Sequence, residues 1–220
     1  MTELRLEKIC YRYPKADKQV LKGVSCIFSE GELSAIVGPS GSGKTTLLSV
    51  MAGMDEPDSG EITVNGEARA GMDLDRYRRE TISMIFQSFQ LFPLLTVEEN
   101  VCYPMDIRGV SMRDARNQAA EALRLTGIGE ELWKRFPANL SGGEQQRVAI
   151  ARALASGAKI LLADELTGNL DQENTENILG ILQMLAHERG YCVIVVTHDM
   201  QVAELSDKVW RMRDGVLEEE

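Results

Sequence analysis

Residues 38–45 read Gly38-Pro39-Ser40-Gly41-Ser42-Gly43-Lys44-Thr45, and this stretch decides the fold. It has the form G-x-x-x-x-G-K-[ST], in which glycines let the backbone turn tightly so that successive N–H groups face one anion. Lys44 supplies a positive charge for the β- and γ-phosphates of a nucleotide, and the Thr45 hydroxyl can ligate Mg²⁺. The stretch therefore predicts a phosphate-binding loop. We expect nucleotide contacts from Gly38, Pro39, Ser40, Gly41, Ser42, Gly43, Lys44, Thr45 and Thr46.

The segments on either side of this loop support the same interpretation. Leu33–Val37 is a short apolar run typical of a buried strand, and Thr46–Met51 continues as a helix. The loop is therefore expected at the N-terminus of a helix, where free N–H groups and the helix dipole favour phosphate.

Composition narrows the class of protein further. The 220 residues include 34 acidic and 24 basic side chains, giving a formal net charge of −10. An acidic surface argues against nucleic acid as the main ligand, because binding to the phosphate backbone needs a basic face. No apolar run approaches the ~20 residues of a membrane-spanning helix, so we expect any membrane role to come through a partner. The four scattered cysteines are expected to be reduced thiols in a cytosolic protein.

The chain alternates between strand and helix patterns, which predicts an α/β fold. Strands are expected at 4–13, 24–28, 61–64 and 82–86, and buried central strands of a parallel sheet at 160–163 and 192–196. Helical patterns dominate the region from about residue 90 to 156. We therefore expect a single domain over 1–220: a RecA-like P-loop NTPase core (1–88 and 157–220), an N-terminal antiparallel β-subdomain, and an inserted α-helical subdomain (roughly 89–156).

Two adjacent carboxylates follow one of the predicted parallel strands. Asp164 and Glu165 end the run Ile160–Ala163, at the strand edge where ligands bind in open α/β sheets. Asp164 is placed to hold Mg²⁺, and Glu165 to polarise a water for in-line attack on a γ-phosphate.

A second anion site is predicted at Leu140-Ser141-Gly142-Gly143-Glu144-Gln145-Gln146-Arg147. Ser141 and Glu144 form a capping box, and the two glycines leave the first helical N–H groups unobstructed. One nucleotide needs only one phosphate-binding loop. Two phosphate sites on one chain therefore suggest that two chains share each nucleotide.

These motifs together resemble the ATP-binding cassette (ABC) ATPases, and the resemblance covers essentially the whole chain. Residues 140–147 resemble the LSGGQ-type signature, from which Ser141, Gly142 and Gly143 are expected to contact nucleotide. The resemblance implies that Gln87 contacts Mg²⁺ and the attacking water, and that His198 contacts the γ-phosphate. It also implies a dimer-crossing loop at Asn169-Leu170-Asp171, with Asp171 among the nucleotide-binding residues.

The residue that stacks on adenine is not settled by the sequence. The resemblance favours Tyr13, although Tyr11 would lie on the same face if residues 9–13 formed a strand. Gln87 is preferred to Gln90 because it directly follows a predicted strand.

The run Asp164-Glu165-Leu166-Thr167-Gly168-Asn169-Leu170-Asp171 is similar to the lipoprotein-release, macrolide-efflux and cell-division ATPases. Leu166 stands where this group usually has proline, which would fix φ after the catalytic glutamate.

The resemblance implies an ATP-hydrolysing subunit that uses ATP and Mg²⁺. It would form a nucleotide-dependent homodimer and energise separate transmembrane permease subunits from the cytoplasmic, inner face of the membrane. The alternative is a mechanical or regulatory ABC ATPase that acts on a membrane complex without transport. For docking to the permease, we expect at least one of Phe89, Leu91 and Phe92 to be exposed.

Overall fold

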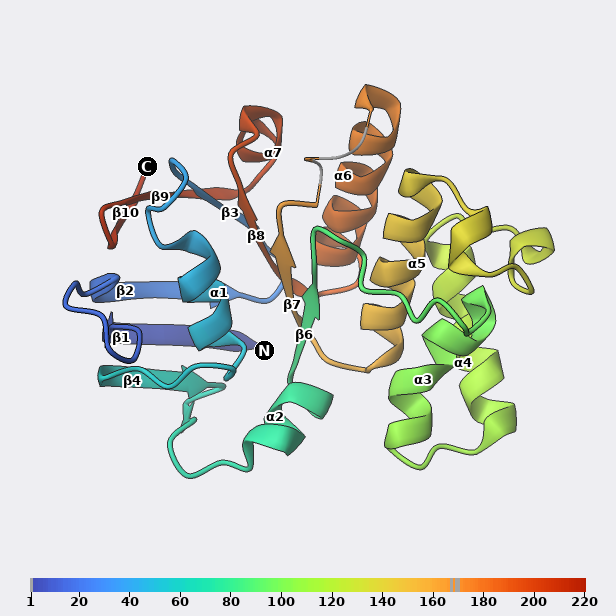
Figure 1. The fold of residues 1–220 in the computed structure, drawn as a ribbon, viewed down its shortest axis with the longest axis horizontal. Coiled ribbons are helices and arrows are strands. Elements are labelled where there is room, and N and C mark those ends of the chain that lie inside the picture. Colours follow the sequence, from blue (N-terminus) through green and yellow to red (C-terminus); the bar gives the residue numbers. More distant parts are fainter. Residues whose placement is uncertain (1, 167, 169–170) are drawn as a thin grey trace.

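The computed structural model describes residues 2–166, 168 and 171–220, and two sheets form its frame (Figure 1). The larger sheet has six strands in the order β10-β9-β3-β8-β7-β6. Its members are β3 (Leu33–Val37), β6 (Ile82–Ile85), β7 (Ile160–Asp164), β8 (Cys192–Thr197), β9 (Lys208–Arg213) and β10 (Val216–Glu219). All neighbours are parallel except the β9–β10 hairpin. The carboxyl ends of β3, β8 and β7 therefore share one edge.

The smaller sheet is antiparallel and comes from the first third of the chain. Its order is β2-β1-β4-β5, with β1 (Glu3–Tyr11), β2 (Leu21–Ser29), β4 (Ser59–Val64) and β5 (Glu67–Ala68). Helix α1 (Lys44–Met51) lies between the two sheets, and α2 (Leu74–Glu80) leads to β6. Leu47 and Leu48 of α1 are fully buried in one apolar cluster with residues of both sheets.

Four helices lie beyond the other face of the parallel strands. They are α3 (Val97–Ile107), α4 (Met112–Leu125), α5 (Gly142–Ala155) and α6 (Gln172–His187), with 3₁₀ turns at Glu130–Leu132 and Pro137–Asn139. A second apolar cluster joins these helices to β3, β7 and β8. Helices α3, α4 and α5 stand beside the sheet as a separate group (Figure 1). The short α7 (Met200–Glu204) follows β8.

Several predicted boundaries shift by a few residues. The first strand ends at Tyr11 rather than Tyr13, and the first helix begins at Lys44 rather than Thr46. The helical region starts with an irregular segment, because its first helix begins only at Val97. Helices α3–α5 fall within the range predicted for the helical subdomain, and the subdomain boundaries stay a prediction. Within the described residues, no helix is both long and apolar enough to cross a membrane.

Candidate functional site

The phosphate-binding loop joins β3 to α1, as the sequence predicts. Gly41 and Gly43 have φ values of 78° and 112°, which L side chains adopt only with strain. The Lys44 Nζ atom is buried and donates to the carbonyl oxygens of Gly38 at 2.7 Å and Pro39 at 3.2 Å. The loop thus wraps around its own ammonium group.

The β9–β10 hairpin packs against this loop and donates a hydrogen bond to it, which the sequence did not indicate. A Cβ on Gly38 would lie 2.2 Å from the Met212 carbonyl oxygen, so only glycine fits there. A Cβ on Gly43 would lie 2.9 Å from the Met212 Cε atom. The Gly215 N–H donates to the Ser42 carbonyl oxygen at 3.0 Å. A strand near the end of the chain therefore sets the shape of the loop.

The two tyrosines at the end of β1 and just beyond it, Tyr11 and Tyr13, have different surroundings. Tyr11 is only 4% exposed, and its hydroxyl donates to Asp55 Oδ1 at 3.0 Å. Tyr13 is 45% exposed, and its hydroxyl lies 2.8 Å from Thr46 Oγ1 at the start of α1. Because Tyr11 points into the core, the accessible ring next to the loop is that of Tyr13.

Asp164 lies at the carboxyl edge of β7, beside Val196 of β8. Burial, and then the neighbouring charge of Glu165, raise the pKa of its carboxyl group, while the Thr45 hydroxyl and the Lys44 charge oppose the rise. Its Oδ1 atom is buried without a hydrogen-bond partner in the part of the chain that the structure describes. A buried, unpaired carboxylate oxygen beside a threonine hydroxyl is the hard-oxygen donor set that suits Mg²⁺.

Glu165 follows in a left-handed backbone conformation, with φ of 46°. Its N–H donates to the Val196 carbonyl oxygen at 2.9 Å, which holds the residue against β8. The His198 Nδ1 atom lies 3.3 Å from Glu165 Oε1. Two residues singled out separately in the sequence are thus brought together at the same sheet edge.

Gln87 is exposed just beyond the end of β6. A Cβ on Gly168 would lie 3.2 Å from the Gln87 Nε2 atom, so the glutamine side chain reaches the segment after Glu165. The Gln90 side chain instead donates to Ser88 Oγ at 2.9 Å. The choice of Gln87 as the residue that contacts Mg²⁺ stays a prediction.

Ser141 caps α5 as predicted. The Glu144 N–H donates to Ser141 Oγ at 3.3 Å, and the Ser141 N–H and hydroxyl both donate to Glu144 Oε2, at 2.7 and 2.8 Å. Ser141 and Gly142 are exposed, whereas Gly143 is buried. The exposed helix start leaves its first N–H groups available to an anion.

Asp171 caps α6, and next to it lies Asn174, which the sequence analysis missed. Asp171 Oδ1 accepts from the Asn174 N–H at 2.9 Å, and the Asn174 side chain also reaches Gly143. Asn169 and Leu170, the rest of the predicted dimer-crossing loop, lie outside the described residues, as does Thr167.

Leu166, which stands where related ATPases usually have proline, is buried in the second apolar cluster, between the helices and the parallel strands. Its side chain therefore packs into the core.

The irregular segment before α3 presents an aromatic side chain. Phe92 is 38% exposed, while Phe89 and Leu91 pack partly against the core, which agrees with the expectation that at least one is exposed. Buried Asn100 holds the segment, accepting from the Phe92 N–H and donating to three carbonyl groups. Arg152 of α5 donates to the carbonyl oxygens of Phe89 and Gln90.

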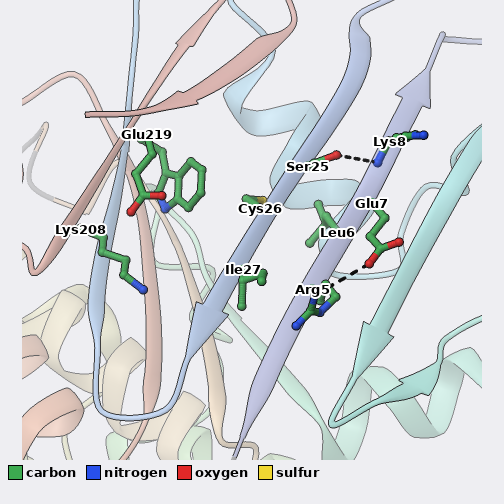
Figure 2. A pocket seen from close by; sticks show the side chains of 10 residues that line it. Arg5, Leu6, Glu7, Lys8, Ser25, Cys26, Ile27, Lys208 and Glu219 are labelled. Carbon is green, nitrogen blue, oxygen red and sulfur yellow. Dashed lines mark hydrogen bonds and ion pairs between the residues drawn. The ribbon is translucent and has the colours of Figure 1, made fainter.

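Two pockets outside the loop region have different linings. One of about 420 Å³ is lined by Phe92, Tyr103, Pro104, Ile107 and three arginines. Another of about 560 Å³ lies between β1, β2 and the β9–β10 hairpin (Figure 2). Its lining mixes apolar groups with both signs of charge and includes none of the predicted site residues.

Comparisons with known proteins extend over nearly the whole chain. The family model described as ABC transporter matches residues 21–168. The chain is 45% identical over 219 residues to the macrolide export ATP-binding/permease protein MacB of Shigella flexneri, covering 97% of this chain and 34% of that protein. It is 44% identical to the uncharacterized ABC transporter ATP-binding protein YbbA of Escherichia coli K12, covering 91% of this chain and 89% of that protein. The chain thus spans about a third of the length of MacB.

Solved structures of ABC cassettes are also similar to this chain. The dimeric bacterial ABC transporter cassette MJ0796 superposes with a TM-score of 0.89 at 38% identity, covering 99% of this chain and 97% of that one. A post-hydrolysis dimer of the same cassette, bound to ADP and Pi, superposes equally well.

Proposed function

The chain belongs to the ABC transporter family, as an ATP-binding and ATP-hydrolysing cassette, and from this premise we propose that it energises a membrane transporter by ATP-driven dimerisation. The observation that carries the proposal is the shared sheet edge. There the loop after β3, the carboxylates after β7 and His198 after β8 converge. Such an edge brings together the groups that phosphoryl transfer to water needs.

We propose the following roles for these groups. Lys44 and the loop N–H groups bind the phosphates, and Tyr13 stacks on the adenine. Thr45, Asp164 and Gln87 hold Mg²⁺, which offsets the charge that develops on the phosphates. Glu165 accepts a proton from the attacking water, and His198 steadies Glu165 and contacts the γ-phosphate. Hydrolysis then depends on positioning and electrostatics.

The second half of each nucleotide site would come from another copy of the chain. Figure 1 places the N-terminal ends of α1 and α5 on opposite sides of β7 and β8, so one molecule does not enclose a nucleotide between them. Ser141 and Gly142 at the start of α5 are exposed and free to face a second copy. We propose that two copies bind two ATP molecules and separate after hydrolysis. The dimeric structure of the MJ0796 cassette supports this.

The membrane partner would dock on the pocket beside Phe92. Its lining includes Phe86, the residue before Gln87, together with other apolar side chains and three arginines, so a helix seated there would sense nucleotide state. We propose that the subunit lies on the cytoplasmic face of the membrane, bound to separate transmembrane permease subunits. The match to a macrolide export protein supports export as the direction.

Affinity isolation from the native cell tests whether the chain binds and energises a membrane protein. The tagged Glu165→Gln variant, with ATP added to detergent-solubilised membranes, should bring down an integral membrane protein. The Phe92→Asp variant in the same background is the control for specific docking. Recovery of the tagged chain free of any membrane protein would contradict the energising role.

A further inference from the structure

The geometry points to Asn174 as a positioning residue that ties the signature helix α5 to Asp171. This inference rests on the proposed function, because both α5 and Asp171 would face the second chain of the dimer. Asn174 lies in the first turn of α6, between the two elements. It belongs to none of the motifs on which the proposed function rests.

The amide of Asn174 presents a different group to each neighbour. Its Nδ2 atom donates to both carboxylate oxygens of Asp171, at 2.9 and 3.0 Å. Its Oδ1 atom accepts from Arg147 Nη1 of α5 at 3.3 Å. An amide offers a donor to a carboxylate on one side and an acceptor to a guanidinium on the other, whereas an ionised carboxylate offers acceptors only. Asparagine therefore fits this position better than aspartate, its near isostere.

The same oxygen lies against residue 143. A Cβ on Gly143 would lie 2.0 Å from Asn174 Oδ1, so a larger residue there would require the asparagine side chain to move. Gly143 is buried at this contact, in contrast to the exposed Ser141 and Gly142. The Asn174 amide thus packs directly against the backbone of the signature motif.

Arg147 strengthens the dependence on Asn174. Its Nη1 atom donates to Asn174 Oδ1, while its Nε atom is buried without a hydrogen-bond partner among the residues that the structure describes. Removing the Asn174 oxygen would leave a further buried donor of this guanidinium unpaired. On the other side, hydrogen bonds from the Asn174 backbone and side chain hold the pKa of Asp171 below its usual value. Asn174 therefore orients the Asp171 carboxylate while it contacts the start of α5.

Dimer formation would use both elements at once. Ser141 and Gly143 would meet the nucleotide of the partner chain, and Asp171 would meet the partner's surface beside it. If Asn174 fixes their relative position, each element docks already aligned with the other. Less conformational entropy is then lost on association. Loss of the amide should weaken dimer closure and leave the monomer's own nucleotide site untouched.

The test compares Asn174→Asp and Asn174→Ala in the Glu165→Gln background, with Gln172→Ala as the control. Gln172 lies in the same turn of α6, and its side chain bonds Glu176 rather than Asp171 or α5. We measure the Mg-ATP concentration that gives half-maximal dimer by light scattering, together with ADP affinity and thermal stability of the monomer. We expect about a tenfold higher Mg-ATP requirement for Asn174→Asp, the loss of one hydrogen bond to a charged group, and none for Gln172→Ala.

A double variant separates this role from a general structural one. Gly143→Ala should displace the Asn174 side chain and so break the same contact as Asn174→Ala. The double variant should therefore need no more Mg-ATP for dimerisation than the single variant that dimerises less readily. Additive losses would overturn the inference. So would an unchanged Mg-ATP requirement for Asn174→Asp, or ADP affinity and stability falling in parallel with dimerisation. Dimerisation of the Glu165→Gln parent in the same series tests the proposed function separately.

Discussion

The Nδ1 atom of His198 lies 3.3 Å from the Oε1 atom of Glu165, although one follows β8 and the other follows β7. The register of the two strands brings them together, because Asp164 pairs with Val196 and the Glu165 N–H donates to the Val196 carbonyl oxygen. A carboxylate held at a sheet edge by the backbone and by a histidine has a fixed position relative to a bound phosphate. This relationship motivates the first prediction.

Glu165→Gln keeps the shape of the side chain and removes its negative charge. We expect ATP binding close to that of the wild type, with turnover reduced by ~10²–10⁴, the scale for losing a general base. Phosphate release measures turnover, and calorimetry measures binding. Lys44→Ala is the contrasting variant, because it should weaken nucleotide binding itself. A Glu165→Gln protein that keeps more than half the wild-type rate would refute the role of Glu165.

Asp164→Asn should stabilise the nucleotide-free protein and abolish hydrolysis. Burial and Glu165 raise the pKa of Asp164, so its ionised form destabilises the fold at neutral pH. The penalty is complete above the raised pKa and disappears below the pKa of the unfolded chain. We expect a higher melting temperature at pH 7, and a smaller difference as the pH falls toward about 4, where the carboxyl group of the unfolded chain protonates. A lower melting temperature at pH 7 would contradict this.

Tyr13→Ala should weaken ATP binding on the order of tenfold, the scale of one base stacked on an aromatic ring. Tyr11→Phe is the matched control: it removes the hydroxyl that bonds Asp55 and keeps the buried ring. We expect Tyr11→Phe to lower thermal stability and leave the affinity unchanged. The opposite pattern, with Tyr11→Phe weakening ATP binding and Tyr13→Ala neutral, would exclude Tyr13.

Phe92→Asp should separate the subunit from its membrane partner. The Phe92 ring lies on the pocket that we propose for docking, 4.5 Å from the Tyr103 ring centre to centre, so replacing it with aspartate removes an apolar anchor from that pocket. Phe136→Asp is the control, because Phe136 is also exposed but does not line that pocket. Basal ATPase of the isolated subunit should change little in either variant. Co-purification of Phe92→Asp with the permease at wild-type yield would show that docking occurs elsewhere.

Local patterns predicted much of the core. Leu33–Val37 forms a strand with the expected bounds, because a continuous apolar run suits a strand buried on both faces. The capping box of Ser141 and Glu144 also forms as expected, since it depends on residues three apart. Such features are set by neighbours in the sequence.

Features that depend on distant segments could not be predicted in this way. The choice between Tyr11 and Tyr13 depended on where β1 ends, and that end is set by pairing with β2. The contacts of Met212 with the phosphate-binding loop and of Asn174 with Gly143 join segments far apart in the chain. One sequence carries no periodic signal for a contact of this kind.

The central claim is that two copies of this chain share each nucleotide, and light scattering after size-exclusion chromatography tests it most directly. Chains of net charge −10 repel each other, so the nucleotide-free protein should be a monomer at low salt. Glu165→Gln protein with Mg-ATP should elute with the mass of a dimer. The further change Ser141→Arg, at the exposed start of α5, should return it to a monomer. A Glu165→Gln protein that stays monomeric with saturating Mg-ATP would contradict the shared site.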